Sequence, residues 1–151
     1  MPTLAPAATD LAVHIHKEVS IAAPAKVVFE SILAQLGPES VQPDGKPLNL
    51  KLEPWPGGRW FRDLGNNTGH FWGHVQVIKP PTLLELSGPL FMSYAAINHV
   101  QYRVTEQPGG KASTLTLVHR ALGDISPDHR EGMTKGWEKM VTMIKDRAQR
   151  P

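Results

Sequence analysis

Hydrophobic positions alternate with polar ones in several short segments of the chain. Between Leu11 and Ile21 the apolar residues alternate loosely with histidine, glutamate and serine, which predicts a β-strand. The same alternation, bounded by glycine, proline or asparagine turns, predicts further strands at 48–53, 59–64, 70–78, 82–87, 98–105 and 112–121.

Two segments repeat instead at the spacing of an α-helix. The first covers 24–36, opens on a proline suited to a first helical turn and ends before Gly37. The second is long and begins at Ser126, an N-cap residue followed by proline and aspartate. Its apolar stripe consists of Met133, Trp137, Met140, Val141, Ile144 and Ala148. This order of elements predicts an α+β fold, with helices on one face of a mostly antiparallel sheet.

Length and composition are those of an ordinary globular domain. The chain has 151 residues, of which 40% are hydrophobic and 20% charged. We expect a flexible tail over 1–10 and one domain over 11–149. The net charge of +2 is too small to indicate a nucleic-acid partner. The N-terminus lacks the features of a signal peptide, and no apolar run is long enough for a membrane span, so a cytoplasmic location is predicted.

The residue types for metal or covalent chemistry are sparse. The chain contains no cysteine, which excludes disulfides, thiolate zinc ligands and a cysteine nucleophile. His14 and His16 share one strand face, as do His70 and His74, but no helical zinc motif accompanies them. No nucleophile motif and no carboxylate pair can be selected. We therefore expect no metal, no cofactor and no assignable catalytic residue.

A curved sheet crossed by one long helix does not fill space easily. A gap between the two layers would be lined by large, adaptable side chains: Met133, Trp137 and Met140 from the helix, and Phe71 and Tyr102 from the strands. Two interpretations stay open from periodicity alone. These residues either fill the core or line a pocket.

The segment PWPGGRWFRD (54–63) is predicted to be a turn and a strand. A phosphate-binding loop would need a helix after its glycines, whereas Arg-Trp-Phe-Arg favours a strand. Alternation places Trp60 and Arg62 on one face. If that face is inward, Arg62 needs a partner, such as an anionic ligand head group; otherwise it is an edge residue paired with a carboxylate.

A histidine and an apolar segment add two further hypotheses. His119 shares a face with Leu115 and Leu117 and is expected to point inward, either as a ligand-contacting acid or base or as a hydrogen-bonded core residue. The segment GPLFMSYAA (88–96) is predicted to be a buried edge strand, a lid at the cavity mouth or a homodimer surface.

Three stretches, with the helical GWEKM (136–140), resemble a known family. They are PWPGGRWFR (54–62), GHVQVIKPPTLLEL (73–86) and TLTLVHRAL (114–122). Their order resembles the START-like (SRPBCC) superfamily, and within it the family of the activator of the heat-shock-protein-90 ATPase. The resemblance covers 13–147 and implies a helix-grip fold, in which a curved antiparallel sheet wraps around a long C-terminal helix.

The resemblance implies three classes of function. The first is binding of a small hydrophobic or amphipathic ligand between sheet and helix, contacted by Trp60, Arg62, Phe71, Tyr102, His119, Met133, Trp137 and Met140. The alternatives are an enzyme of the polyketide cyclase type and a co-chaperone or protein-interaction domain. We expect a small-molecule partner and leave a homodimer open. An apolar cavity would favour binding, convergent polar groups would favour an enzyme, and a filled core would favour an interaction domain.

Overall fold

The computed structural model describes residues 12–91 and 95–151 of the chain. The elements are β1 (Ala12–Ile21), α1 (Ala25–Leu36), β2 (Leu50–Leu52), β3 (Arg59–Gly65), β4 (Thr68–Lys79), β5 (Leu83–Gly88), β6 (Ala96–Glu106), β7 (Ser113–Gly123) and α2 (Pro127–Ala148). The predicted N-terminal tail over 1–10 lies outside the described residues.

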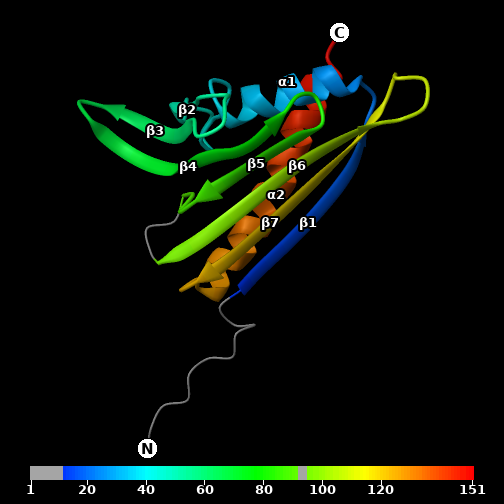
Figure 1. Cartoon of the computed structure of the whole chain (residues 1–151). Coiled ribbons are helices and arrows are strands. Elements are labelled where there is room, and N and C mark those ends of the chain that lie inside the picture. The colour runs from blue at the N-terminus through cyan, green and yellow to red at the C-terminus, as the bar shows by residue number, and fades with distance from the viewer. Residues whose placement is uncertain (1–11, 92–94) are drawn as a thin grey trace, which may run out of the picture.

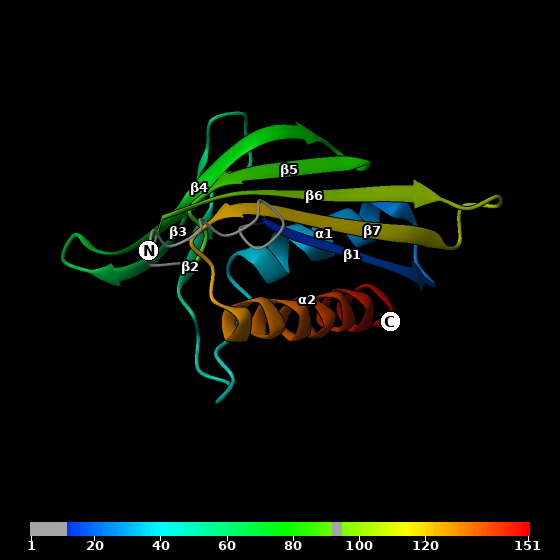
Figure 2. The ribbon, with the colours of Figure 1, turned by 90° about the horizontal axis from the view of Figure 1, so that it is seen from below.

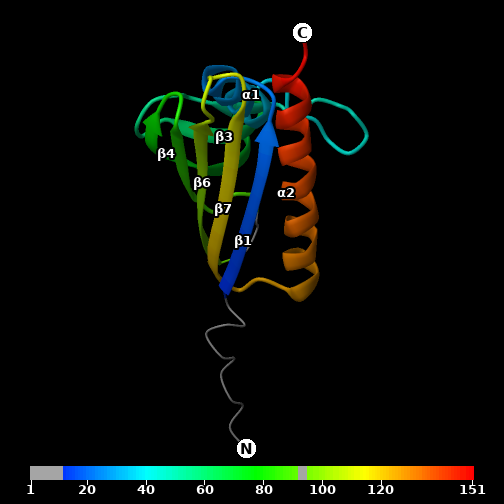
Figure 3. The ribbon, with the colours of Figure 1, turned by 90° about the vertical axis from the view of Figure 1, so that its right-hand side faces the viewer.

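The strands form one sheet with the two helices on the same side of it. Within the described ranges the sheet has seven strands in the order β1-β7-β6-β5-β4-β3-β2, and all neighbours are antiparallel. Figure 1 shows α2 running along the sheet, and Figure 2 shows both helices beneath it. Viewed from the β1 edge, α1 lies across one end of the sheet (Figure 3). The predicted α+β helix-grip fold is confirmed.

The long helix begins and ends where its end residues favour it. The Ser126 hydroxyl accepts a hydrogen bond from the backbone N–H of His129 at 3.2 Å, and proline occupies the first turn. Asp128 lies near the positive end of the helix dipole, while Lys145 and Arg147 lie near the negative end. The buried stripe that fixes the helix on the sheet consists of Met133, Trp137, Val141, Ile144 and Ala148.

Two predicted strands differ from the observed ones. The strand predicted over 48–53 is shorter, because Asn49 has a φ of 58°, in the left-handed region, and interrupts the extended backbone before Leu50. The segment 88–96 is not an edge strand over its described part. β5 ends at Gly88 and β6 begins at Ala96, both strands are interior to the sheet, and 89–91 form a turn.

A β-bulge changes which side chains of β4 face the helices. Trp60 pairs with Gly73 but Phe61 pairs with Phe71, so Trp72 is an extra residue opposite β3. Regular alternation in the strand predicted over 70–78 puts Phe71 on the same face as Gly73 and Val75, in line with its predicted place in the gap. This prediction is wrong, because the bulge shifts the alternation by one: Val75 is buried, whereas Phe71 is 44% exposed.

Candidate ligand-binding cavity

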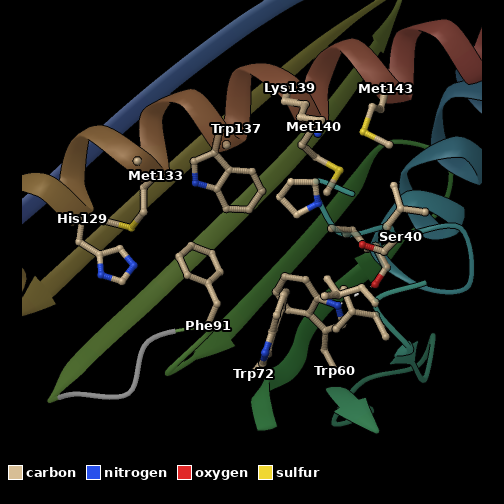
Figure 4. A pocket seen from close by; sticks show the side chains of 17 residues that line it. Ser40, Trp60, Trp72, Phe91, His129, Met133, Trp137, Lys139, Met140 and Met143 are labelled. Carbon is tan, nitrogen blue, oxygen red and sulfur yellow. Dashed lines mark hydrogen bonds between the residues drawn. The ribbon is translucent and has the colours of Figure 1, made fainter. Parts of the chain in front are cut away.

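A cavity of about 340 Å³ lies between the sheet and α2. Figure 4 shows side chains from α2 on one side, with Trp60 and Trp72 facing them from the strands. The connection between α1 and β2 also contributes to the lining. The lining residues are Leu36, Ser40, Val41, Pro43, Leu48, Leu50, Trp60, Trp72, Phe91, His129, Gly132, Met133, Gly136, Trp137, Lys139, Met140 and Met143. The volume falls in the range of small-molecule sites in proteins.

Aromatic rings form one wall of the cavity. Trp60 meets Trp72 edge to face with ring centroids 5.0 Å apart, and Trp72 meets Phe91 in the same way at 5.7 Å. Phe91 in turn stacks on His129 of α2, with centroids 6.2 Å apart. Trp60 is held from behind, because its indole N–H donates to the backbone carbonyl of Leu36 at 2.8 Å. The wall therefore spans from α1 to the first turns of α2.

α2 forms the opposite wall, where two exposed glycines lie beside the larger side chains of Met133 and Trp137. Gly132 and Gly136 both line the cavity, and their spacing of four places them on one helix face. A Cβ atom added at either position would meet no other atom within 4 Å. Met140 and Met143 continue this face towards the C-terminus and supply flexible apolar side chains.

Polar side chains are few along this lining. Ser40, His129 and Lys139 are its hydroxyl, imidazole and ammonium groups, and Lys139 is exposed to solvent. The indole Nε1 of Trp72 is buried and has no hydrogen-bond partner in the described part of the chain. A buried N–H donor without a partner costs free energy, and a molecule in the cavity does not reach this one, because the atom has essentially no accessible surface.

His119 lies in the core behind the cavity and is fully hydrogen-bonded. The indole N–H of Trp137 donates to its Nδ1 at 2.8 Å, so Nε2 carries the proton and donates to Asn98 Oδ1 at 2.8 Å. Burial, together with the charge of nearby His99, lowers the pKa of His119 to about 4. The imidazole is therefore neutral near pH 7. Of the two hypotheses for His119, the structure matches the hydrogen-bonded core residue.

The cavity brings together part of the set of residues predicted to contact a ligand. Trp60, Met133, Trp137 and Met140 line it. Tyr102 does not, although it packs edge to face on Trp137 with centroids 6.3 Å apart. Its hydroxyl has no partner among the described residues, and burial raises the pKa of this group.

Arg62 and Phe71 lie elsewhere, in a polar hollow on the β2–β3–β4 region. The guanidinium Nε of Arg62 donates to the backbone carbonyl of Leu48 at 3.1 Å. This partner differs from both sequence hypotheses for Arg62, a ligand head group and a surface carboxylate. Phe71 turns away from the cavity because of the bulge at Trp72. Neither residue is positioned to touch a molecule in the cavity.

Several lining residues were not predicted from the sequence. Trp72 was missed because the bulge that turns it inward has no local sequence signal beyond the neighbouring Gly73. Phe91 belongs to the apolar segment 88–96, which did indicate a role near the cavity mouth. Ser40, Val41 and Pro43 come from a connection that shows no periodicity.

Neither a metal-binding cluster nor a membrane-spanning helix occurs in the described part of the chain. In the ranges 12–91 and 95–151, no group of three or more histidine, aspartate or glutamate side chains is arranged to hold a metal ion. No helix in these ranges is long and apolar enough to cross a membrane.

Known proteins resemble this chain in fold. No protein-family model and no curated protein matches it. Among solved structures, protein CV1439 from Chromobacterium violaceum has a TM-score of 0.65 at 14% identity, covering 92% of this chain and 99% of that one. CalU16 from Micromonospora echinospora has a TM-score of 0.61 at 20% identity, covering 90% of this chain and 76% of that one. The di-domain ARO/CYC protein BexL has a TM-score of 0.63 at 17% identity, covering 94% of this chain and 52% of that one.

At these identities the similarity shows the fold alone. The neighbours agree with the helix-grip fold that the sequence resemblance implied. The finer resemblance to the activator of the heat-shock-protein-90 ATPase is not confirmed by them.

Proposed function

We propose that the protein binds a small hydrophobic or amphipathic molecule in the cavity between the sheet and α2. The observation that carries this proposal is the lining, which is apolar except for Ser40, His129, Lys139 and the tryptophan N–H groups. Such a surface gains free energy when an apolar molecule displaces water from it. Trp60, Met133, Trp137 and Met140 are the predicted contact residues that we retain for this role.

An enzyme of the polyketide cyclase type is the alternative, and its support is the fold shared with the ARO/CYC protein BexL. Neither Arg62 nor His119, the arginine and the histidine among the predicted contact residues, reaches the cavity. Arg62 lies in the hollow on β2–β4, and both ring nitrogens of His119 are engaged in the core. A cyclase would instead have to use His129, the imidazole that lines the cavity. Binding is therefore the better supported function.

A protein-interaction role has less support. A filled core would favour such a role, whereas the described residues line a cavity. Ile97 and Leu122 do form an exposed apolar pair on neighbouring strands, 75% and 56% exposed. A homodimer through this or another surface stays a prediction, which light scattering of the purified protein would check.

Native mass spectrometry of protein purified gently from its own host tests the binding function. We expect a discrete added mass that is lost on denaturation. The matched variants are Gly136→Leu, whose side chain would occupy the cavity, and Thr142→Leu, on the same helix but outside the lining. The first should carry no added mass and the second should keep it. A clean apo mass, with no binding from a metabolite and lipid library, would overturn the proposal.

A further inference from the structure

The face of the sheet that points away from the helices is uncovered by other elements in the described part of the chain (Figure 2). Strand pairing brings side chains from six strands into one row across this face. From β3 to β1 the successive cross-strand partners are Arg59, His74, Ser87, His99, Arg120 and His14, which we call the basic row. Neighbouring strands lie about 4.8 Å apart, so the row extends over roughly 24 Å.

Acidic residues neutralise only part of the basic row. Glu53 accepts a hydrogen bond from Arg59 Nε at 2.8 Å, and Glu85 Oε1 lies 2.8 Å from His99 Nε2. Arg120 is exposed and forms no ion pair with any residue that the structure describes. The β7 and β1 end of the row therefore presents a cation to solvent without a counter-charge.

Two exposed aliphatic side chains lie next to this end of the row. Ile97 and Leu122 are cross-strand partners, 75% and 56% exposed. Each is two residues from a member of the row, His99 or Arg120, and so lies on the same face of the sheet. Exposed aliphatic groups beside cations are the combination with which peripheral proteins bind anionic lipid bilayers.

The aliphatic pair favours a lipid surface over a nucleic acid. A single strand of nucleic acid is held by aromatic rings that stack on successive bases, and aliphatic side chains offer no such platform. Phe71 is an exposed ring near the other end of the row, where it contacts His74 edge to face with ring centroids 4.8 Å apart. One ring at one end does not provide a stacking surface along the row.

We propose that the protein docks on membranes containing anionic lipids through the uncovered face of the sheet. Arg120 and the histidines of the basic row lie at the lipid head groups, and Ile97 and Leu122 enter the bilayer boundary beside them. The helices and the cavity lie on the opposite side of the sheet, as Figure 3 shows for α2. This inference therefore does not depend on what the cavity binds.

Co-sedimentation with lipid vesicles tests the docking surface. We expect binding to phosphatidylcholine vesicles that contain about 30% phosphatidylserine, and little binding to phosphatidylcholine alone. Arg120→Glu should weaken this binding roughly tenfold, because it removes one cation and adds an anion at the head groups. Lys135→Glu is the matched control, since it makes the same charge change at an exposed position of α2 and should leave binding unchanged.

The aliphatic contacts are tested separately from the charges. The double variant Ile97→Ser with Leu122→Ser should weaken vesicle binding at least roughly fivefold, because two exposed apolar groups no longer enter the bilayer. Both positions are exposed, so the melting temperature should change little, and thermal unfolding checks this.

The histidines of the row supply a readout that a purely structural role would not move. Histidine is the side chain whose charge changes between about pH 5 and about pH 8. The charged groups that face the three imidazoles from neighbouring strands are Arg59, Arg120 and Glu85, while His16 and Glu18 lie further along β1. Protonation adds positive charge, so binding should tighten several-fold from about pH 7.5 to about pH 6. Replacing His14, His74 and His99 together by glutamine should remove this dependence.

Four results would each overturn the proposal. The first is equal or absent binding to both kinds of vesicle, and the second is an equal loss of binding in Lys135→Glu and Arg120→Glu. The third is tighter binding of a uridine oligonucleotide than of the anionic vesicles, which would indicate a nucleic-acid surface. The fourth is a dimer in light scattering that the Ile97→Ser and Leu122→Ser variant dissociates, which would indicate a contact between two copies of the chain.

Discussion

Trp72 and Trp137 line the same cavity but end in opposite chemical situations. The N–H of Trp137 donates to His119, which continues through Asn98 to the backbone carbonyl of Pro89 at 3.3 Å. The N–H of Trp72 has no partner among the described residues. One indole is thus fixed by a series of hydrogen bonds, and the N–H of the other makes none.

The regions behind the two tryptophans differ in the same way. Behind Trp137 the neighbouring β6 and β7 side chains, among them Val100, Leu117 and His119, have no exposed surface. Around Trp72 the strand is bulged, the ring is half-buried and cavity lies in front of it. A rigid, fully hydrogen-bonded region supports a region with unfilled space and an unused donor. Binding sites require this combination, because the support holds contact residues in place while the site stays open.

The largest change in stability should come from breaking the hydrogen bonds behind Trp137. His119→Leu removes the acceptor of the Trp137 N–H and the hydrogen bond to Asn98 Oδ1 in the core, which should lower the free energy of unfolding by about 3 kcal/mol. Urea denaturation measures the change. His16→Leu is the control, since His16 is exposed on β1 and its replacement should alter stability by less than about 0.5 kcal/mol. Equal effects of the two replacements would show that the buried hydrogen bonds of His119 contribute nothing to stability.

Acid should weaken the same region. The pKa of His119 is about 4 in the folded protein, below its ordinary 6.5, so the unfolded chain binds the proton more tightly. The contribution of neutral His119 to the free energy of unfolding is fully present above pH 6.5. It is lost as the pH falls towards 4, by an amount on the order of 3 kcal/mol. Unfolding curves at a series of pH values should show this loss in the unaltered protein and a smaller one in His119→Gln. Parallel pH profiles of the two proteins would contradict the shift.

Replacing each tryptophan by phenylalanine compares the two sides directly. Both changes remove the same atoms, but only Trp137→Phe breaks a hydrogen bond and leaves His119 Nδ1 without its donor. Trp137→Phe should therefore cost about 1 kcal/mol more than Trp72→Phe in the free energy of unfolding. Thermal and urea unfolding of both variants check the difference. A larger cost for Trp72→Phe would mean that its N–H has a stabilising partner.

The smallest effect is expected at Phe71, next to Trp72 in the chain. Its ring is 44% exposed and lies in the hollow on β2–β4, so Phe71→Ala should lower the free energy of unfolding by less than about 1 kcal/mol. Urea unfolding measures the change. A loss of stability as large as that of Trp72→Phe would contradict the difference in burial between the two neighbours.

The local pattern of the sequence was sufficient for the elements and their order. Alternation in β1 and β5–β7 and the stripe on α2 depend on which residues are apolar, and burial of those residues fixes strand and helix faces. His119 was correctly placed inward for this reason. The end signals of α2 at Ser126 are equally local, since the cap bonds a residue three positions away.

The cavity and its chemistry depended on tertiary structure. Trp72 faces the helices because β4 has one residue more than β3 at that point, and a bulge is a property of two paired strands. The partners of His119 lie 21 and 18 residues away on β6 and α2, which no local pattern connects. In the regular strands and in α2 the sequence determined which side chains are buried, but at the bulge it did not. Only the packing of sheet on helix decided which of them meet each other and which meet open space.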